Sequence, residues 1–187
     1  MNLLYGGGYT KRFEPIFQEL EKVLPASVTE FCFGDVYIAR WCENNGIAWK
    51  GIDLNPGFVR MAKTAGFHAK EADVLELPAY PPADVGIIAG ALYHFTDVEL
   101  RDFLEKVFLA TPVLVVSEPV RNLSTSMGFV GKIIAGALTH TAKRETHFRY
   151  TREGLLDILS SRSKELNFSI RLVKEYKNDI ILILTTN

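Results

Sequence analysis

The chain has 187 residues, of which 48% are hydrophobic and 23% charged, a composition that predicts one globular domain with a sizeable core. Its formal net charge of −1 gives no reason to expect nucleic acid as a partner. It has neither an apolar run as long as a membrane span nor a signal-peptide pattern, so we expect a cytoplasmic protein without a membrane span. The two cysteines, Cys32 and Cys42, have neither the number nor the spacing of a zinc site, so we predict no metal.

The chain begins with a glycine-rich segment, residues 1–11, that contains Tyr5 and Tyr9. Three successive glycines are typical either of a floppy terminus or of a flexible flap over a ligand. From Phe13 to Leu24 the apolar residues share one face at helical spacing, which predicts an amphipathic helix.

The stretch from Val28 to Asp53 predicts a strand, a tight turn, a helix and a second strand, which together form a right-handed parallel βαβ unit. Gly34 breaks the first strand, so backbone can approach a ligand there. Asp53 ends the second strand about 20 residues later, where an acid can accept hydrogen bonds from both hydroxyls of a ribose. The simpler interpretation is that Gly34 only makes a turn and that Asp53 caps the next helix.

The glycine content of this turn separates two kinds of cofactor. A dinucleotide fingerprint needs three glycines, whereas the segment EFCFGDV at 30–36 has one. Asp35, at the start of the helix, would repel a pyrophosphate, so a nucleoside without phosphates fits better. This segment contains an acid, Glu30, then the small residue Cys32 and then Gly34, and Asp53 is an acid at the end of the next strand. This pattern resembles that of the class I S-adenosylmethionine-dependent methyltransferases.

This resemblance implies the fold and the cofactor. The fold is α/β, a doubly wound, mostly parallel seven-stranded sheet that ends in an antiparallel hairpin, with helices on both faces, and the cofactor is S-adenosylmethionine. Two residues depart from the family pattern, because Cys32 and Val36 stand where the family often has glycine. Val36 is β-branched, so it could narrow the turn or shift the cofactor.

After Asp53, Asn55 is expected to cap a helix that starts with Pro56 and ends at Gly66, and a polar edge strand should follow at 68–71. The triplet Ala72-Asp73-Val74 then matches the family segment that reads adenine. The resemblance implies that Asp73 accepts from the exocyclic amine and that the next backbone N–H donates to the ring. The alternative is an Asx-turn.

The apolar run 84–89 predicts a central parallel strand, and Gly90 follows at its carboxyl end, where open α/β sheets bind ligands. The resemblance implies that backbone around Gly90 faces the methionine part of the cofactor and that Tyr93 and His94 face the methyl acceptor. We expect His94 to be the general base, although it could simply pack at the strand end. Thr96 begins a capping box for a helix that runs to about Leu109.

The resemblance therefore implies a set of cofactor-binding residues at the strand ends and in the N-terminal segment: Tyr9, Glu30, Cys32, Gly34, Asp53, Leu54, Asp73, Val74 and Gly90. Lys11 or Arg12 could join Tyr9 over the methionine end. Another buried strand is predicted at 112–117, and Glu118 after it could touch substrate or cap a loop.

The last third of the chain predicts a helix and a hairpin. The apolar face at 127–138 is expected to be a lid or ordinary packing, with a dimer face or a membrane-surface helix as alternatives. A basic cluster at 143–149 is either a solvated connector or a clamp for an acidic acceptor. Thr151 should cap a helix that runs to about Ser161, and two strands, 168–176 and 179–185, must be antiparallel because two residues join them.

We therefore expect a single Rossmann-like domain over residues 1–187, with residues 1–27 as an N-terminal flap and helix and 120–150 as a possible lid. The expected function is transfer of a methyl group from S-adenosylmethionine to a small-molecule acceptor. The alternative is a non-catalytic nucleotide-fold binding protein, a pseudoenzyme whose cofactor site has decayed. A nicotinamide-dependent oxidoreductase ranks last, and the sequence leaves the oligomeric state open.

Overall fold

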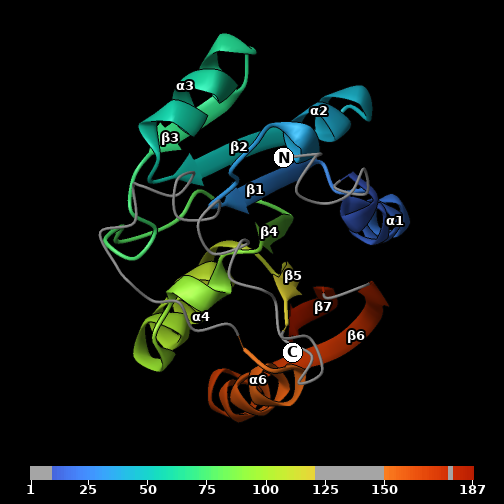
Figure 1. Cartoon of the computed structure of the whole chain (residues 1–187), viewed down its shortest axis with the longest axis vertical. Helices are drawn as coiled ribbons and strands as arrows, with labels where there is room; N and C mark the ends of the chain where they lie inside the picture. Colours follow the sequence, from blue (N-terminus) through green and yellow to red (C-terminus); the bar gives the residue numbers. More distant parts are fainter. Residues whose placement is uncertain (1–9, 121–149, 177–178) are drawn as a thin grey trace, which may run out of the picture.

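The structure is a computed structural model that describes residues 10–120, 150–176 and 179–187. Within these residues, the helices and strands follow one another as labelled in Figure 1: η1 (Thr10–Phe13), α1 (Glu14–Val23), β1 (Ser27–Phe31), α2 (Tyr37–Asn44), β2 (Ala48–Asp53), α3 (Pro56–Thr64), β3 (His68–Glu71), β4 (Val85–Ala89), η2 (Leu92–His94), α4 (Asp97–Ala110), β5 (Val113–Pro119), α6 (Arg152–Leu166), β6 (Phe168–Tyr176) and β7 (Asp179–Thr186). Tyr9, the 127–138 apolar face and the 143–149 basic cluster lie outside the described residues.

The strands of the described chain form one seven-stranded sheet in the order β3-β2-β1-β4-β5-β7-β6. The pairings from β3 to β5 are parallel, whereas β7 runs antiparallel to both β5 and β6. The predicted fold class is confirmed, including the antiparallel hairpin. The sequence had not indicated that β7, the second strand of that hairpin, lies between β5 and β6.

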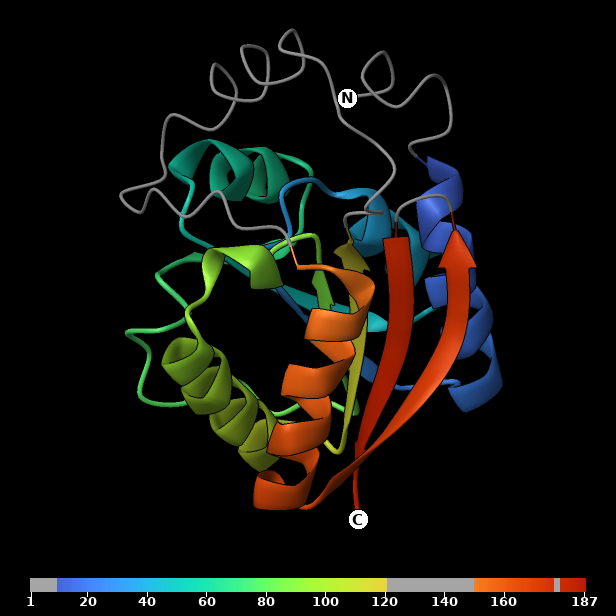
Figure 2. The ribbon, with the colours of Figure 1, turned by 60° about the horizontal axis from the view of Figure 1, so that its bottom comes forward.

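Helices cover both faces of the sheet, with α1, α2 and α3 on one face and α4 and α6 on the other (Figures 1 and 2). Each face has its own core, because side chains alternate along a strand. In β1, Val28 packs with the helices of the first group and Phe31 with those of the second. The continuous apolar runs of β4 and β5 are buried on both faces, as expected for central parallel strands.

Most predicted helix boundaries are confirmed, and two are corrected. Thr96 forms the complete capping box of α4, and Thr151 accepts the Gly154 N–H at the start of α6. However, α3 ends at Thr64, before Gly66, and α6 continues to Leu166 instead of ending near Ser161. The residues that follow Ser161 in α6 are polar up to Glu165, so the apolar periodicity gave no signal for that last part.

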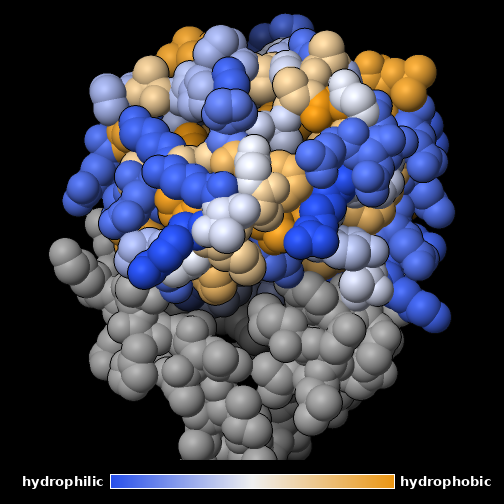
Figure 3. All heavy atoms as spheres, turned by 90° about the horizontal axis from the view of Figure 1, so that it is seen from above, coloured by the Kyte–Doolittle hydropathy of each residue, from blue (hydrophilic) through white to orange (hydrophobic). Residues whose placement is uncertain are grey.

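The surface of the described residues mixes polar and apolar side chains. In Figure 3, hydrophilic residues surround smaller groups of hydrophobic ones on the face seen from above. The exposed large hydrophobic side chains belong to several different elements and loops. Within the described residues, none of the helices has the length and apolar character that crossing a membrane requires.

Candidate functional site

The candidate site lies where the strand order reverses, between β1 and β4, at the carboxyl ends of both strands. In open α/β sheets, ligands bind outside this switch point, because the two exit loops turn in opposite directions and leave a crevice. Gly34 follows β1 and Gly90 follows β4, and both have left-handed backbone, with φ of +63° and +70°. Two chain exits with exposed backbone therefore face each other across the switch point.

Asp53 fixes the turn after β1 to the start of α3. One carboxylate oxygen, Oδ2, accepts the Gly34 N–H at 3.0 Å, and Oδ1 accepts the Asn55 N–H at 2.7 Å. Asn55, not Asp53, caps α3, because its side chain accepts the Gly57 N–H. A carboxylate oxygen can accept more than one hydrogen bond, so both oxygens of Asp53 can still accept from a ligand hydroxyl.

Burial raises the pKa of Asp53, and the two backbone hydrogen bonds partly oppose this shift. Leu54, next to Asp53, is 45% exposed and lies on the rim of the site. The side chain of Asp53 therefore sits in a partly dehydrated place beside exposed backbone, where hydrogen bonds to a polar ligand are stronger than in water.

The two departures from the family glycines have different outcomes. Val36 has φ of −99°, which any residue adopts, and its side chain is buried in the core under α1 and α2. Val36 therefore does not need to be glycine. Cys32 does have left-handed backbone, with φ of +54°, and its N–H donates to the Ile52 carbonyl at 2.7 Å.

Asp73 makes the Asx-turn that was the alternative interpretation, since its Oδ1 accepts the Leu75 N–H at 2.9 Å. Its Oδ2 accepts no hydrogen bond from the part of the chain that the structure describes. The loop is joined to β2, because the Ala72 N–H donates to the Asp53 carbonyl at 3.0 Å. The turn therefore leaves one oxygen of Asp73 available for a ligand and keeps it beside Asp53.

Glu118, at the end of β5, shapes the loop that leaves β4. It is completely buried, and its Oε2 and Oε1 accept the N–H groups of Leu92 and Tyr93 at 3.0 and 3.3 Å. Burial raises the pKa of Glu118 to about 8, against the effect of these hydrogen bonds and of the nearby Arg12 charge. The sequence left two roles open for Glu118, contact with substrate or capping of a loop, and these hydrogen bonds show that it caps the loop.

His94 ends η2, immediately after this loop. Its ring lies against that of Tyr93, with 4.0 Å between the ring centroids. Both side chains are half-buried. The structure thus places His94 on the loop that Glu118 holds, on the same edge of the sheet as Gly90.

Arg12 lies at this edge too, although the sequence gave it no specific partner. It is buried and pairs with Asp179 of β7, with 3.1 Å between Nε and Oδ2. A Cβ atom at Gly90 would lie 3.4 Å from its Nη2 atom, so the guanidinium packs against the Gly90 backbone. The sequence could not reveal this pair, because Arg12 and Asp179 belong to opposite ends of the described chain.

Glu30 points to the opposite side of β1, into the core under α1 and α2. Its Oε2 accepts the indole N–H of Trp49 at 2.8 Å, and burial raises its pKa well above the ordinary value. The Trp49 ring also covers Gly51, where a Cβ atom would lie 2.2 Å from the ring. The Oε2 atom of Glu30 therefore accepts a hydrogen bond inside the core.

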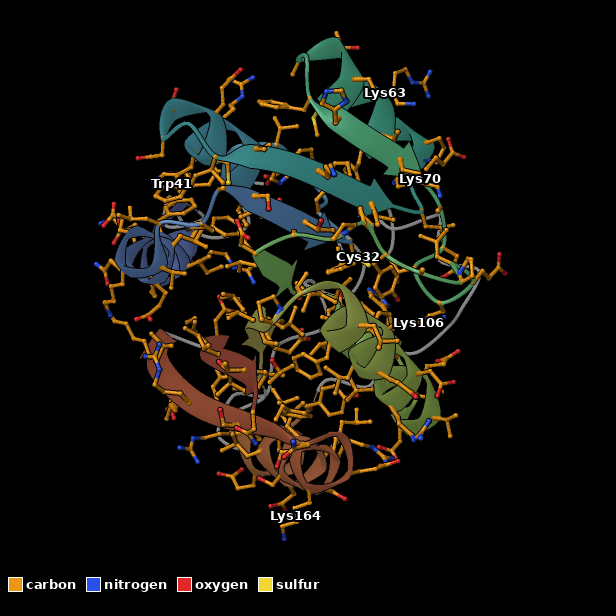
Figure 4. The ribbon with its side chains drawn as sticks, turned by 180° about the vertical axis from the view of Figure 1, so that it is seen from behind. Cys32, Trp41, Lys63, Lys70, Lys106 and Lys164 are labelled. Carbon is orange, nitrogen blue, oxygen red and sulfur yellow. The ribbon has the colours of Figure 1, made fainter. Side chains whose placement is uncertain are left out.

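The site is acidic around Cys32, which lies at the end of β1 in Figure 4. Burial raises the pKa of its thiol, and the charges of nearby carboxyl groups raise it further. These groups come from four strand ends or loops: Asp53, Asp73, Glu118 and Glu30. Since the raised pKa values of Glu118 and Glu30 favour their neutral forms, the negative charge at this edge comes from Asp53 and Asp73, and it favours a cation over a phosphate.

The structure thus brings together Cys32, Gly34, Asp53, Asp73 and Gly90, whereas Tyr9 lies outside the described residues. Among the described residues, no three histidine, cysteine or acidic side chains form a group that could hold a metal ion.

Comparison with known proteins identifies the fold by its similarity to solved structures. No family model matches the sequence, and no curated protein matches it either. Among solved structures, the methyltransferase domain of a bacterial Hen1 aligns with a TM-score of 0.71 at 13% identity, covering 95% of this chain and 97% of that chain. Magnesium protoporphyrin IX methyltransferase from Synechocystis, with bound S-adenosylmethionine, aligns with a TM-score of 0.66 at 13% identity, over 96% of this chain and 80% of that chain.

A protein from Pyrococcus horikoshii aligns with a TM-score of 0.68 at 15% identity, covering 96% of this chain and 91% of that chain. At such identities the likeness concerns the fold. The chain has the fold of the class I S-adenosylmethionine-dependent methyltransferases, as the sequence predicted.

Proposed function

We propose that the chain is an S-adenosylmethionine-dependent methyltransferase that acts on a small-molecule acceptor. The observation that carries this proposal is the pair of carboxylates, Asp53 and Asp73, that follow neighbouring strands beside the switch point and keep oxygen lone pairs for a ligand. S-adenosylmethionine brings a sulfonium and an ammonium group, which this acidic edge favours. The pyrophosphate of a dinucleotide would meet the same charges as a dianion, which weighs against a nicotinamide cofactor.

The residues at the strand ends fit the nucleoside part of this cofactor. Asp53 keeps lone pairs on both oxygens for the two ribose hydroxyls. The open oxygen of Asp73 and the neighbouring Val74 N–H form an acceptor and a donor for the edge of adenine. Gly34 lets backbone come close to a ligand, since no neighbouring atom lies within 4 Å of the place its Cβ would take, whereas the Arg12 guanidinium packs against Gly90.

When bound, the sulfonium supplies an electrophilic methyl group and a neutral thioether leaving group. The chain then has to align donor and acceptor and to exclude water. We propose that His94 accepts the proton that the attacking oxygen or carbon of the acceptor loses, because histidine is the side chain that most often serves as a general base. The small-molecule acceptor is inferred from the sequence of segment 127–138, which lies outside the described residues.

Calorimetric titration with S-adenosylhomocysteine tests the cofactor site. We expect the Asp53→Asn variant to bind at least about tenfold more weakly than the unmodified chain, because a charge-assisted hydrogen bond contributes ~1.5–3 kcal/mol. Asp157→Asn removes an exposed carboxylate of α6 and should leave the affinity unchanged. Titration with NAD is the control for the oxidoreductase interpretation.

Two outcomes would contradict the proposal. If the folded, unmodified chain does not bind S-adenosylhomocysteine, the cofactor assignment is wrong. If it binds NAD instead, the oxidoreductase interpretation takes its place. Binding without methyl transfer to any acceptor in a broad screen would favour the non-catalytic binding protein.

A further inference from the structure

The loop between β3 and β4 carries Asp73, and side chains from other parts of the fold hold its backbone. The Tyr80 hydroxyl donates to the Val74 carbonyl at 2.8 Å. The Lys106 ammonium, on α4, donates to the Leu75 carbonyl at 2.9 Å. Together with the Asx-turn of Asp73, these bonds engage three consecutive polar groups of the loop: the Val74 C=O, the Leu75 N–H and the Leu75 C=O.

One backbone donor in this series stays unpaired. The Val74 N–H donates to no group of the described chain, although the Val74 side chain is buried at 3% exposure. Unpaired backbone N–H groups in buried segments are rare, because each one costs the energy of a lost hydrogen bond. Next to this donor lies the open Oδ2 of Asp73, so the loop presents one donor and one acceptor side by side.

Both holding residues connect the loop to rigid parts of the fold. The Tyr80 ring is buried between Phe31 of β1 and Phe103 of α4, with centroid distances of 4.8 and 5.9 Å. Lys106 lies on α4, on the side of the molecule where Figure 4 also labels Cys32. Burial raises the pKa of the Tyr80 hydroxyl, and the nearby Cys32 and Asp73 raise it further, which agrees with a position beside both residues.

We propose that Tyr80 and Lys106 are positioning residues that make the nucleoside site selective for adenine over hypoxanthine. This inference rests on the proposed function. Adenine presents an amino donor and a ring-nitrogen acceptor on its pairing edge, which matches the Asp73 oxygen and the Val74 N–H. Hypoxanthine presents the opposite pattern, a carbonyl acceptor and a ring N–H donor, so it would leave the Val74 N–H and the half-buried Asp73 oxygen facing like groups.

The test compares binding of S-adenosylhomocysteine with binding of its deaminated analogue, S-inosylhomocysteine, by calorimetry. For the unmodified chain we expect a preference of at least about 100-fold for the adenine compound, since sites built to hydrogen-bond a ligand group discriminate by up to ~10⁴–10⁵. Tyr80→Phe, which removes only the hydroxyl, and Lys106→Met should each reduce this preference about tenfold. Lys164→Met, at an exposed position of α6 far from Lys106 in Figure 4, should leave it unchanged.

The preference ratio separates positioning from general stability. If Tyr80→Phe and Lys106→Met weaken both ligands equally and keep the ratio, the two residues are only structural and the inference fails while the proposed function stands. If the unmodified chain binds neither ligand, the proposed function itself fails. Circular dichroism and thermal unfolding show in each case that the variants are folded.

Discussion

Among the described residues other than glycine, Cys32 has left-handed backbone together with Leu24 and Asn167. At φ of +54°, an L-residue carries roughly 1–2 kcal/mol of strain that glycine does not have. The thiol is partly buried against the core, together with Ala72 and Leu75. The chain thus tolerates a side chain at this turn because the side chain packs inward, at the expense of a strained backbone.

Replacing Cys32 with alanine or with glycine separates strain from packing. Both variants lose the thiol and differ only in the Cβ atom. We expect Cys32→Gly to be more stable than Cys32→Ala by about 1 kcal/mol in urea unfolding, because glycine relieves the left-handed strain. In ordinary helical or extended backbone the order is the reverse, with alanine more stable by roughly 0.4–1 kcal/mol. An alanine variant that is the more stable of the two would therefore disprove the strain at this turn.

At the scale of elements, the ion pair between Arg12 and Asp179 joins η1 to the start of β7 across the edge of the sheet that carries the site. Both groups are buried, and the Arg12 guanidinium also lies against Gly90. A buried charge that loses its partner is strongly destabilising, because it stays dehydrated without compensation. This ion pair therefore joins the N-terminal helices to the terminal hairpin, together with the pair of Glu19 on α1 and Arg171 on β6.

A double-mutant cycle measures this link. We expect Arg12→Met alone to lower the free energy of unfolding by about 3–5 kcal/mol, since it removes the cation that pairs with the buried Asp179 carboxylate. The double variant with Asp179→Leu should cost at least about 1 kcal/mol less than the sum of the single variants. As a control, the half-exposed pair of Arg152 and Glu175 should couple by no more than about 1 kcal/mol. Equal coupling in the two pairs would show that burial does not matter here.

The order and type of most elements could be predicted from the sequence, because each depends on local signals. The Thr96 capping box, the Asn55 cap with Pro56, and the two-residue link of the hairpin are written in neighbouring residues. Asp53 and Asp73 could be located for the same reason, since Asp53 ends β2 and Asp73 lies in the turn just after β3.

Contacts between distant segments could not be predicted. The pairing of Arg12 with Asp179, the bond between Lys106 and the Leu75 carbonyl, and the position of β7 inside the sheet all depend on packing of the whole chain. The positive φ of Cys32 was missed for another reason: a cysteine gives no local sign of left-handed backbone, whereas a glycine does.

For the molecule as a whole, buried carboxyl groups make stability depend on pH. The folded pKa of Glu118 is raised to about 8, whereas the unfolded chain has the ordinary value near 4.5. Between these values the folded chain holds a proton that the unfolded chain has released. The stability that Glu118 contributes is therefore fully present below pH 4.5 and is lost as the pH rises through about 8. Asp53 and Glu30 act in the same direction.

The Glu118→Gln variant isolates this contribution. Its amide does not titrate, so between pH 5 and 8 its free energy of unfolding should fall less steeply than that of the unmodified chain. The difference in slope should be at most about 1.4 kcal/mol per pH unit, the value for one proton. Urea unfolding at a series of pH values measures it, with Asp157→Asn as the exposed control. Parallel pH profiles for Glu118→Gln and the unmodified chain would contradict a protonated Glu118.

The place of β7 between β5 and β6 also has a consequence for folding of the chain during translation. Until β7 has been synthesised, the apolar strand β5 has an open edge, and β6 has no strand through which to join the sheet. At ~5–20 residues per second, translation from Pro119 to Asp179 takes roughly 3–12 s. During those seconds the edge of β5 has no partner strand and can pair with a strand of another chain. We therefore expect the yield of folded protein to depend on how well this edge is kept from such pairing during translation.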